Sequence, residues 1–256
     1  MKIFYFISDS HFGSDEPERE KIKQNQLFSF LEEISKGDSH LYILGDFFEI
    51  WFEYKNAMPK CYFHILVALS RLVESGVGID LIVGNHDYWV HNFLQREIGI
   101  RVHQKPVDVM LHGKRFYIAH GDGLIKSNIA SVILSGITKN PVNIFLYRLL
   151  SPDFSIPLAS FSSKLSRNRN SRNVNPDDVK GKYAKFAQRK LMSGFDGVIL
   201  GHTHQPVLTK YGDKVYLNTG DWLETFSYGK LDNGNLSLNY WRPENSHNLN
   251  ISQTRI

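Results

Sequence analysis

The sequence is poor in cysteine: Cys61 is the single thiol among 256 residues. One cysteine excludes an intramolecular disulfide and favours a reducing compartment. The chain also lacks any run of about 20 apolar residues, the length that a membrane-spanning helix needs. Its apolar N-terminal run, Ile3–Ile7, stops at Ser8 and is too short for the core of a secretory signal peptide. These absences predict a protein that is soluble or lies on a membrane surface.

Acidic residues are scarce between Leu124 and Lys190, where twelve basic residues stand against three acidic ones. The whole chain has a net charge of only +4, so its positive charge is concentrated in this segment. The pattern indicates either an ordinary solvated face or a surface that meets phosphate groups or anionic lipid. The positive charge of this segment would also be compatible with a nuclease. However, aromatic side chains on which nucleic-acid bases could stack are absent from Ser162–Arg172. No nucleic-acid partner is therefore expected.

One pattern recurs along the chain: a short apolar run ends abruptly in polar side chains that can bind metal. Runs of this kind, when bounded by glycine, are typical of buried strands. Their polar ends should meet at one edge, because ligands bind beyond the carboxyl ends of strands in α/β sheets. The five polar clusters are Asp9-Ser10-His11, Gly45-Asp46, Gly84-Asn85-His86-Asp87, His120-Gly121-Asp122 and Gly201-His202-Thr203-His204.

Helical patterns lie between these strands. Gln24–Ile34 and Cys61–Val73 each place apolar residues on one stripe, and an N-cap, a proline and two acids at 175–178 predict the start of a helix that continues through Lys180–Met192. Short strands alternate with turns from Lys214 to Arg242, including a hairpin turn at 232–235.

The segment 124–172 does not follow the strand-to-ligand pattern. Ile129–Ile137 and Val142–Leu150 are strongly apolar, and Ser162–Asn175 is rich in Ser, Asn and Arg. We interpret 124–172 as a helical cap inserted into a core made of 1–123 and 173–242, followed by a polar tail at 243–256. The apolar cap segments are either core helices or a groove for acyl chains or a membrane.

Seven side chains in the five clusters are candidate metal ligands: Asp9, His11, Asp46, Asn85, His120, His202 and His204. Carboxylate, imidazole and carboxamide groups suit Mn, Fe, Zn or Mg. Seven ligands are too many for one tetrahedral centre and suit two metals that share one carboxylate. Where two ligands lie at i and i+2, an extended backbone would place both on the same side, and the geometry of a loop could also turn them toward one site. Each residue alone could instead be a helix cap, a turn residue or a core histidine, but five ordered clusters favour a metal site.

The order of these motifs resembles the motif order of the calcineurin-like metallophosphoesterase superfamily. That order is D-x-H, then G-D, then G-N-H-[DE], then H, then G-H-x-H. The resemblance implies an α/β (α+β) fold of two packed mixed sheets flanked by helices. It implies two divalent ions, manganese first and iron or zinc as alternatives. One ion would be held by Asp9, His11, Asp46 and His204, and the other by Asp46, Asn85, His120 and His202.

Within that superfamily the chain is similar to the UDP-2,3-diacylglucosamine hydrolases of lipid A synthesis, on the stretches Tyr42–Trp51, His120–Asp122 and Gly201–Pro206. The similarity implies a nucleotide-linked acylated sugar as substrate, with UMP and 2,3-diacylglucosamine 1-phosphate (lipid X) as products. It also implies a cytoplasmic enzyme, peripheral at the inner membrane. The chain has His86 where the best-known branch of these hydrolases has arginine. The oligomeric state stays open.

The predicted catalytic residues are His86, which would contact the phosphate or protonate the leaving oxygen, and Asp87, which would orient His86 or cap a helix. The predicted substrate-binding residues are Asn85, His86, Asp122, Lys164, Arg167, Arg169 and Arg172. A phosphodiesterase or nucleotidase with a water-soluble substrate is the alternative function. A non-catalytic scaffold is disfavoured because none of the ligand positions has been lost.

Overall fold

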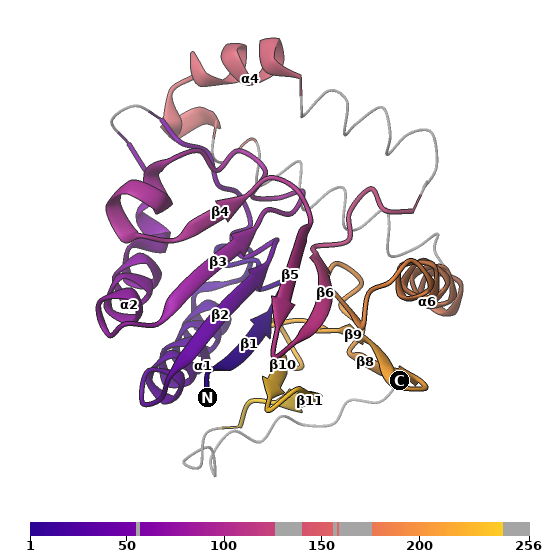
Figure 1. The fold of residues 1–256 in the computed structure, drawn as a ribbon. Coiled ribbons are helices and arrows are strands. Elements are labelled where there is room, and N and C mark those ends of the chain that lie inside the picture. Colours follow the sequence, from indigo (N-terminus) through magenta and orange to yellow (C-terminus); the bar gives the residue numbers. More distant parts are fainter. Residues whose placement is uncertain (55–56, 126–139, 156–157, 159–175, 243–256) are drawn as a thin grey trace, which may run out of the picture.

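The structure is a computed structural model that describes residues 1–54, 57–125, 140–155, 158 and 176–242. Two β-sheets pack face to face, and helices flank them on the outside (Figure 1). The first sheet has the strand order β11-β10-β1-β2-β3-β4, and the second has the order β5-β6-β7-β9-β8. The strands are β1 (Ile3–Ile7), β2 (Ser39–Leu44), β3 (Gly78–Ile82), β4 (Arg101–His103), β5 (Val107–Leu111), β6 (Lys114–Ala119), β7 (Gly197–Leu200), β8 (Val207–Tyr211), β9 (Lys214–Asn218), β10 (Ser227–Asp232) and β11 (Asn235–Tyr240).

α-Helices accompany the sheets in the described part of the chain. They are α1 (Pro17–Ile34), α2 (Phe63–Glu74), α4 (Pro141–Arg148) and α6 (Pro176–Met192), with short helical turns η1 (Lys60–Tyr62) and η2 (Leu94–Ile98). Helices α1 and α2 lie on the outer side of the first sheet, and α6 lies on the outer side of the second (Figure 1). The predicted α/β class with two mixed sheets is confirmed.

Strand direction brings the five polar clusters together. Strands β1, β2, β3 and β4 run parallel, so their carboxyl ends share one edge of the first sheet. Strands β6, β7 and β9 run parallel in the second sheet. The clusters follow β1, β2, β3, β6 and β7, as the sequence predicts.

The alternation of side chains along each strand divides the core into layers. Phe6 and Leu44 point between the sheets and are fully buried there with Ile118 and Leu217. Their neighbours on the same strands, such as Ile43, pack on the outer side against α1 and α2. Each fully buried large apolar side chain contributes about 1.5–3 kcal/mol. The metal-capable loops therefore rest on two rigid sheets.

Several elements differ from the sequence prediction. Helix α1 begins at Pro17 rather than Gln24, because a proline and two acids make a good polar first turn that apolar periodicity cannot detect. The short strands β4, β5 and β8 were not predicted, since their exposed side chains weaken the apolar signal. The hairpin between β10 and β11 and the start of α6 are confirmed.

Much of the predicted cap lies outside the described residues, so the domain boundaries at 124–172 stay a prediction. Its described part contains α4, which stands apart from both sheets at the top of the molecule (Figure 1). The predicted tail at 243–256 also lies outside the described residues. So do four predicted substrate-binding residues, Lys164, Arg167, Arg169 and Arg172. Within the described ranges, no helix has the length and apolarity needed to span a bilayer.

Candidate metal centre

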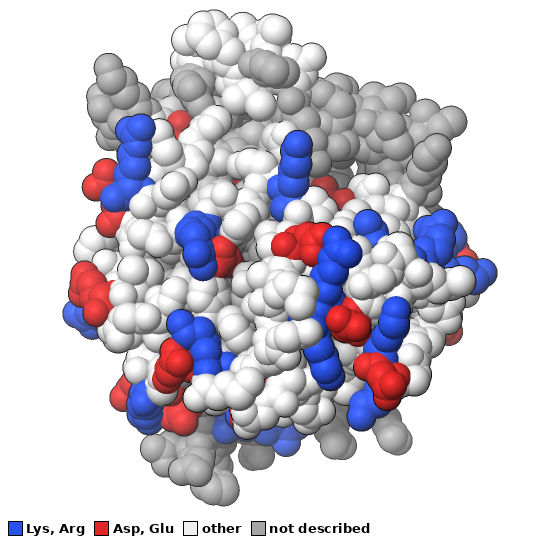
Figure 2. All heavy atoms as spheres, in the orientation of Figure 1, with Lys and Arg blue, Asp and Glu red and all other residues white. Residues whose placement is uncertain are grey.

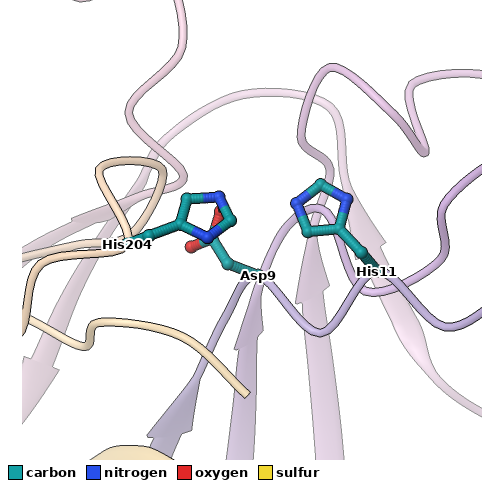
Figure 3. Close-up of side chains that lie close together, drawn as sticks. All are labelled: Asp9, His11 and His204. Atoms are coloured by element: carbon teal, nitrogen blue, oxygen red, sulfur yellow. The ribbon is translucent and has the colours of Figure 1, made fainter. Parts of the chain in front are cut away.

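The predicted ligands meet where the carboxyl ends of the two sheets face each other. Asp9, His11 and His204 form one group, in which the candidate ligand atoms all lie within 4.8 Å of one another. Figure 3 shows the Asp9 carboxylate next to the His204 ring, with the His11 ring on the other side of Asp9 from His204; the two histidines come from different loops. His204 Nε2 lies 3.4 Å from Asp9 Oδ1. Residues almost 200 positions apart in the chain thus share one site.

Asp46, His120 and His202 form a second group of the same kind, and His11, Asp46 and His86 form a third that overlaps the first at His11 and the second at Asp46. Oδ2 of Asp46 lies 3.3 Å from His120 Nε2 and 3.8 Å from His11 Nε2. The same carboxylate oxygen therefore faces both groups. This is the position that the sequence analysis assigns to a shared ligand.

The backbone at the ligands is left-handed rather than extended. Asp9 and His11 have φ values of 53° and 43°, Asp46 has 49°, and His202 and His204 have 70° and 55°. Of the two arrangements expected for the i and i+2 ligands, the extended backbone is absent and the loop geometry is present. The strands have already ended at these positions, and left-handed turns aim the side chains instead. Such conformations cost non-glycine residues about 1–3 kcal/mol each and cluster at functional sites.

Two motif glycines allow the ligand loops to approach closely. A Cβ on Gly84 would lie 2.2 Å from Oδ1 of Asp46, and a Cβ on Gly201 would lie 2.6 Å from the Ser8 hydroxyl. Neither contact is sterically possible without moving the loop. These glycines are thus required by the metal centre rather than by turn geometry alone.

The residues present fit a divalent metal centre. Asp9 Oδ1 and His11 Nε2 are buried yet lack hydrogen-bond partners among the described residues. His202 Nδ1 lies 3.1 Å from His120 Nε2, so two ring nitrogens face each other. Buried polar atoms of this kind are costly without a proton or a cation between them. Overlapping groups of hard and borderline ligands, two of which contain Asp46, satisfy this requirement.

Burial and mutual charge set the protonation of the second group. Burial alone would raise the pKa of Asp46, but His120 and His86 hold it well below its usual range. Burial opposes protonation of His120, yet the carboxylate of Asp46 raises its pKa well above the usual value. Burial and then the charge of His120 lower the pKa of His202 to about 4. A proton on His120 thus partly balances the carboxylate, a role that a cation would take over.

The remaining predicted site residues surround these groups. The His86 ring packs edge-on against His11, with ring centroids 4.7 Å apart. Asn85 precedes it with an exposed side chain, and Asp122 is half-buried on the loop that carries His120. The contacts of Asp87 differ from the expectation that it orients His86. Its carboxylate accepts the amides of Gly84 at 2.6 Å and Phe47 at 2.9 Å.

Asp87 therefore ties the loop after β3 to the loop after β2. Burial and then the negative charge of Asp46 raise its pKa to about 6. It supports the backbone of the site, and the side chain that would contact substrate is that of His86.

Sequence reasoning missed two buried charged residues beside the ligands. Glu49 is 2% exposed and accepts a hydrogen bond from His11 Nδ1 at 3.0 Å. Lys23 is fully buried and donates to the backbone carbonyls of Ser10 and His11. The position of Glu49 just after Gly45-Asp46 could have indicated a residue of the site. Lys23 gives no such indication, because in the sequence it occupies an ordinary polar position on an amphipathic helix.

Comparison with known proteins places this arrangement in a family. The model of the calcineurin-like phosphoesterases matches residues 3–206. The chain belongs to the calcineurin-like phosphoesterase family. This phosphoesterase is 30% identical over 250 residues to the UDP-2,3-diacylglucosamine hydrolase of Porphyromonas gingivalis, covering 91% of this chain and 95% of that protein. It is 29% identical to the protein of the same name from Pseudomonas fluorescens, over 86% and 88% of the two chains.

Among solved structures, a novel archaeal phosphodiesterase aligns with 93% of this phosphoesterase and 99% of that chain, at 14% identity and a TM-score of 0.45. That similarity is too remote to bear on function. Members of the family use a divalent metal centre, and the three overlapping ligand groups of this phosphoesterase are candidates for it.

Proposed function

We propose that this phosphoesterase hydrolyses UDP-2,3-diacylglucosamine to UMP and 2,3-diacylglucosamine 1-phosphate, as a step of lipid A synthesis. Relatives of that name align over nearly the full length of both chains, which supports the proposal. The observation that carries it is a helix, packed on the chain just after two of the ligand clusters, that presents an apolar face to solvent.

Helix α4 exposes an apolar stripe at i, i+3, i+4 and i+7. Val142 is 63% exposed, Phe145 61%, Leu146 54% and Leu149 68%. In Figure 2 the described surface that is visible over α4, at the top, is white. A water-soluble nucleotide has no use for such a face, because it offers no polar partner. Acyl chains or the apolar part of a membrane would be buried by it.

Aromatic contacts attach α4 to the loops of the metal centre. The Tyr147 ring lies 4.8 Å from Phe52 and 5.2 Å from Trp89, measured between ring centroids. Phe52 follows the Asp46 loop, and Trp89 follows His86 and Asp87. An acyl chain that reached α4 would thus lie on the segments that continue from two of the ligand loops.

The reaction we propose is in-line attack of water on the phosphorus at the uridine side. Two divalent ions, Mn²⁺ first among the candidates, would neutralise the phosphoryl charge and lower the pKa of the attacking water. Asp9, His11, Asp46 and His204 would hold one, and Asp46, Asn85, His120 and His202 the other. His86 contacts the phosphate or protonates the leaving oxygen. Asp122 and the basic residues Lys164, Arg167, Arg169 and Arg172 would contact the diphosphate or the sugar.

We further propose that the enzyme works on a membrane surface, with the α4 stripe toward the lipid. A single apolar stripe gives weak, reversible association, which suits an enzyme that must release a soluble nucleotide. Anionic lipid would add to the attraction, because basic residues predominate between Leu124 and Lys190.

The test compares UMP release from the acylated substrate and from a UDP-sugar that lacks acyl chains, in detergent micelles with Mn²⁺. Burial of about four methylene groups would contribute about 3 kcal/mol, or roughly 200-fold in kcat/KM. Equal rates would remove acyl recognition and favour a water-soluble substrate. Absence of UMP release from both would leave only phosphoester hydrolysis.

A further inference from the structure

The carboxylate of Glu49 is buried beside two histidines of the metal centre. Its Oε2 lies 3.0 Å from His11 Nδ1 and 3.8 Å from His86 Nδ1. Glu49 belongs to none of the three groups of candidate ligands. A buried carboxylate is costly unless hydrogen bonds compensate for the lost water, so this position requires a role.

The backbone holds Glu49 firmly in this position. His11 N donates to Asp46 O, Phe12 N donates to Phe47 O, and Glu49 N donates to Phe12 O, at distances of 2.9–3.0 Å. These bonds extend the pairing of β1 and β2 beyond the ends of both strands. Glu49 is therefore fixed relative to the loop that carries Asp9 and His11.

The hydrogen bond from His11 decides which ring nitrogen can bind a metal. In a neutral imidazole one nitrogen carries the proton and the other carries the lone pair. A carboxylate at Nδ1 fixes the proton there, which leaves the lone pair on Nε2. Nε2 of His11 is the buried atom without a hydrogen-bond partner among the described residues, and it faces Oδ2 of Asp46. The pair Glu49–His11 thus has the arrangement of an outer carboxylate behind a metal-binding histidine.

The same residue also orients His86, through its backbone. Nδ1 of His86 lies 2.9 Å from the carbonyl oxygen of Glu49, which can only accept. Nδ1 must therefore be the donor, and a protonated His86 ring would carry its second N–H on Nε2. One residue holds a candidate metal ligand with its side chain and the candidate catalytic histidine with its main chain.

We propose that Glu49 is a positioning residue that aims Nε2 of His11 at a metal ion and Nε2 of His86 at the phosphate. The inference rests on the metal centre of the proposed function and is independent of the lipid substrate. It assigns Glu49 no contact with substrate, since it acts through the two histidines.

Glu49→Ala and Glu49→Gln test the role, because glutamine can still accept the proton of His11 Nδ1 while it lacks the charge. Glu53→Gln is the matched control: Glu53 accepts the backbone amides of His91, Asn92 and Phe93 close by, and none of these is a candidate ligand. The first measurement is the dissociation constant of each Mn²⁺ ion, by competition with a chelating dye. The second is the ¹⁵N chemical shift of the histidine ring nitrogens in the metal-free protein.

In Glu49→Ala we expect one of the two ions to bind about 10–100-fold more weakly, the usual effect of losing an outer-sphere carboxylate. Glu49→Gln should recover part of that affinity, and the ¹⁵N spectrum should show His11 shifting from the Nδ1–H form toward the Nε2–H form in Glu49→Ala only. Wild-type affinity with an unchanged tautomer in Glu49→Ala would overturn the proposal. Equal losses in Glu49→Ala and Glu53→Gln, with Glu49→Gln giving no recovery, would also overturn it. Because no readout uses the lipid, failure of the proposed substrate leaves this result intact.

Discussion

The backbone amide of His86 donates a hydrogen bond to Oδ1 of Asp46 at 2.9 Å. This bond occupies one oxygen of the carboxylate and leaves Oδ2 facing His11 and His120. Asp46 therefore has two separable functions: it anchors the loop that carries His86, and it offers one oxygen to both ligand groups.

Substitution at Asp46 should separate these functions. Asp46→Asn keeps an oxygen that can accept the His86 amide but lacks the negative charge, whereas Asp46→Ala lacks both. We expect both variants to lose metal and to fall in kcat/KM by more than about 10²-fold, beyond the usual effect of an outer-sphere change. Metal analysis after dialysis, with parallel thermal denaturation, checks this. Full activity of either variant, or of chelator-treated wild type, would exclude a shared metal ligand at this position.

Replacement of His86 should affect turnover more than metal content. His86→Ala should keep most of its metal and lower kcat by about 10²–10⁴-fold, the range for losing a general acid or a comparable phosphate contact. His86 is expected to act on the substrate, because its Nδ1 is already engaged by a backbone carbonyl. The measurement is kcat per bound metal ion. A collapse of metal content with normal turnover per remaining ion would instead make His86 a structural residue.

The apolar stripe of α4 should determine association with lipid. Leu149→Asp should reduce sedimentation with anionic phospholipid vesicles and raise KM for the acylated substrate, because a charge cannot enter the apolar region. Met110→Asp is the control, since Met110 is 61% exposed on β5, close to the 68% of Leu149. Hydrolysis of a UDP-sugar without acyl chains should be unchanged in both. Equal loss of vesicle binding in both variants would show that the effect comes from added negative charge alone.

Asp80 should make stability depend on pH in the acid range. Burial would raise its pKa, but hydrogen bonds from His103, His40 and Arg101 outweigh that effect and hold the pKa well below its usual value. A carboxyl group with a lowered pKa in the folded state stabilises it above about pH 4, the usual pKa of aspartate. That stabilisation is lost as the pH falls toward the folded-state pKa.

Asp80→Asn should therefore lower the free energy of unfolding by about 1.5–3 kcal/mol at neutral pH, the range for hydrogen bonds to a charged group. The difference from wild type should shrink as the pH falls below 4. Urea denaturation at a series of pH values measures it. Asp108→Asn, which breaks the exposed pair with Arg115, should change stability little. A difference that stays constant down to pH 3 would contradict the role of the Asp80 charge.

Much of this architecture is local and could be predicted from the sequence. The apolar runs before Asp9, Asp46, Asn85, His120 and His202 form buried strands as predicted, because burial of both faces leaves a continuous apolar pattern. Parallel strands must present their carboxyl ends at one edge, so the convergence of these residues follows from the strand assignment. The ligand types by themselves indicate the class of metal.

Other features depend on contacts between distant segments. The sequence predicts neither which sheet each strand joins nor that β10 pairs with β1, since these pairings depend on packing across the whole core. The left-handed backbone at Asp9 and His11 is imposed by the loops around it, against the intrinsic preference of those residues. Sequence determined which side chains could bind metal. Only the tertiary structure decided that Glu49 and Asp87 support them, because a buried carboxylate is recognised by the partners that fill its hydrogen bonds.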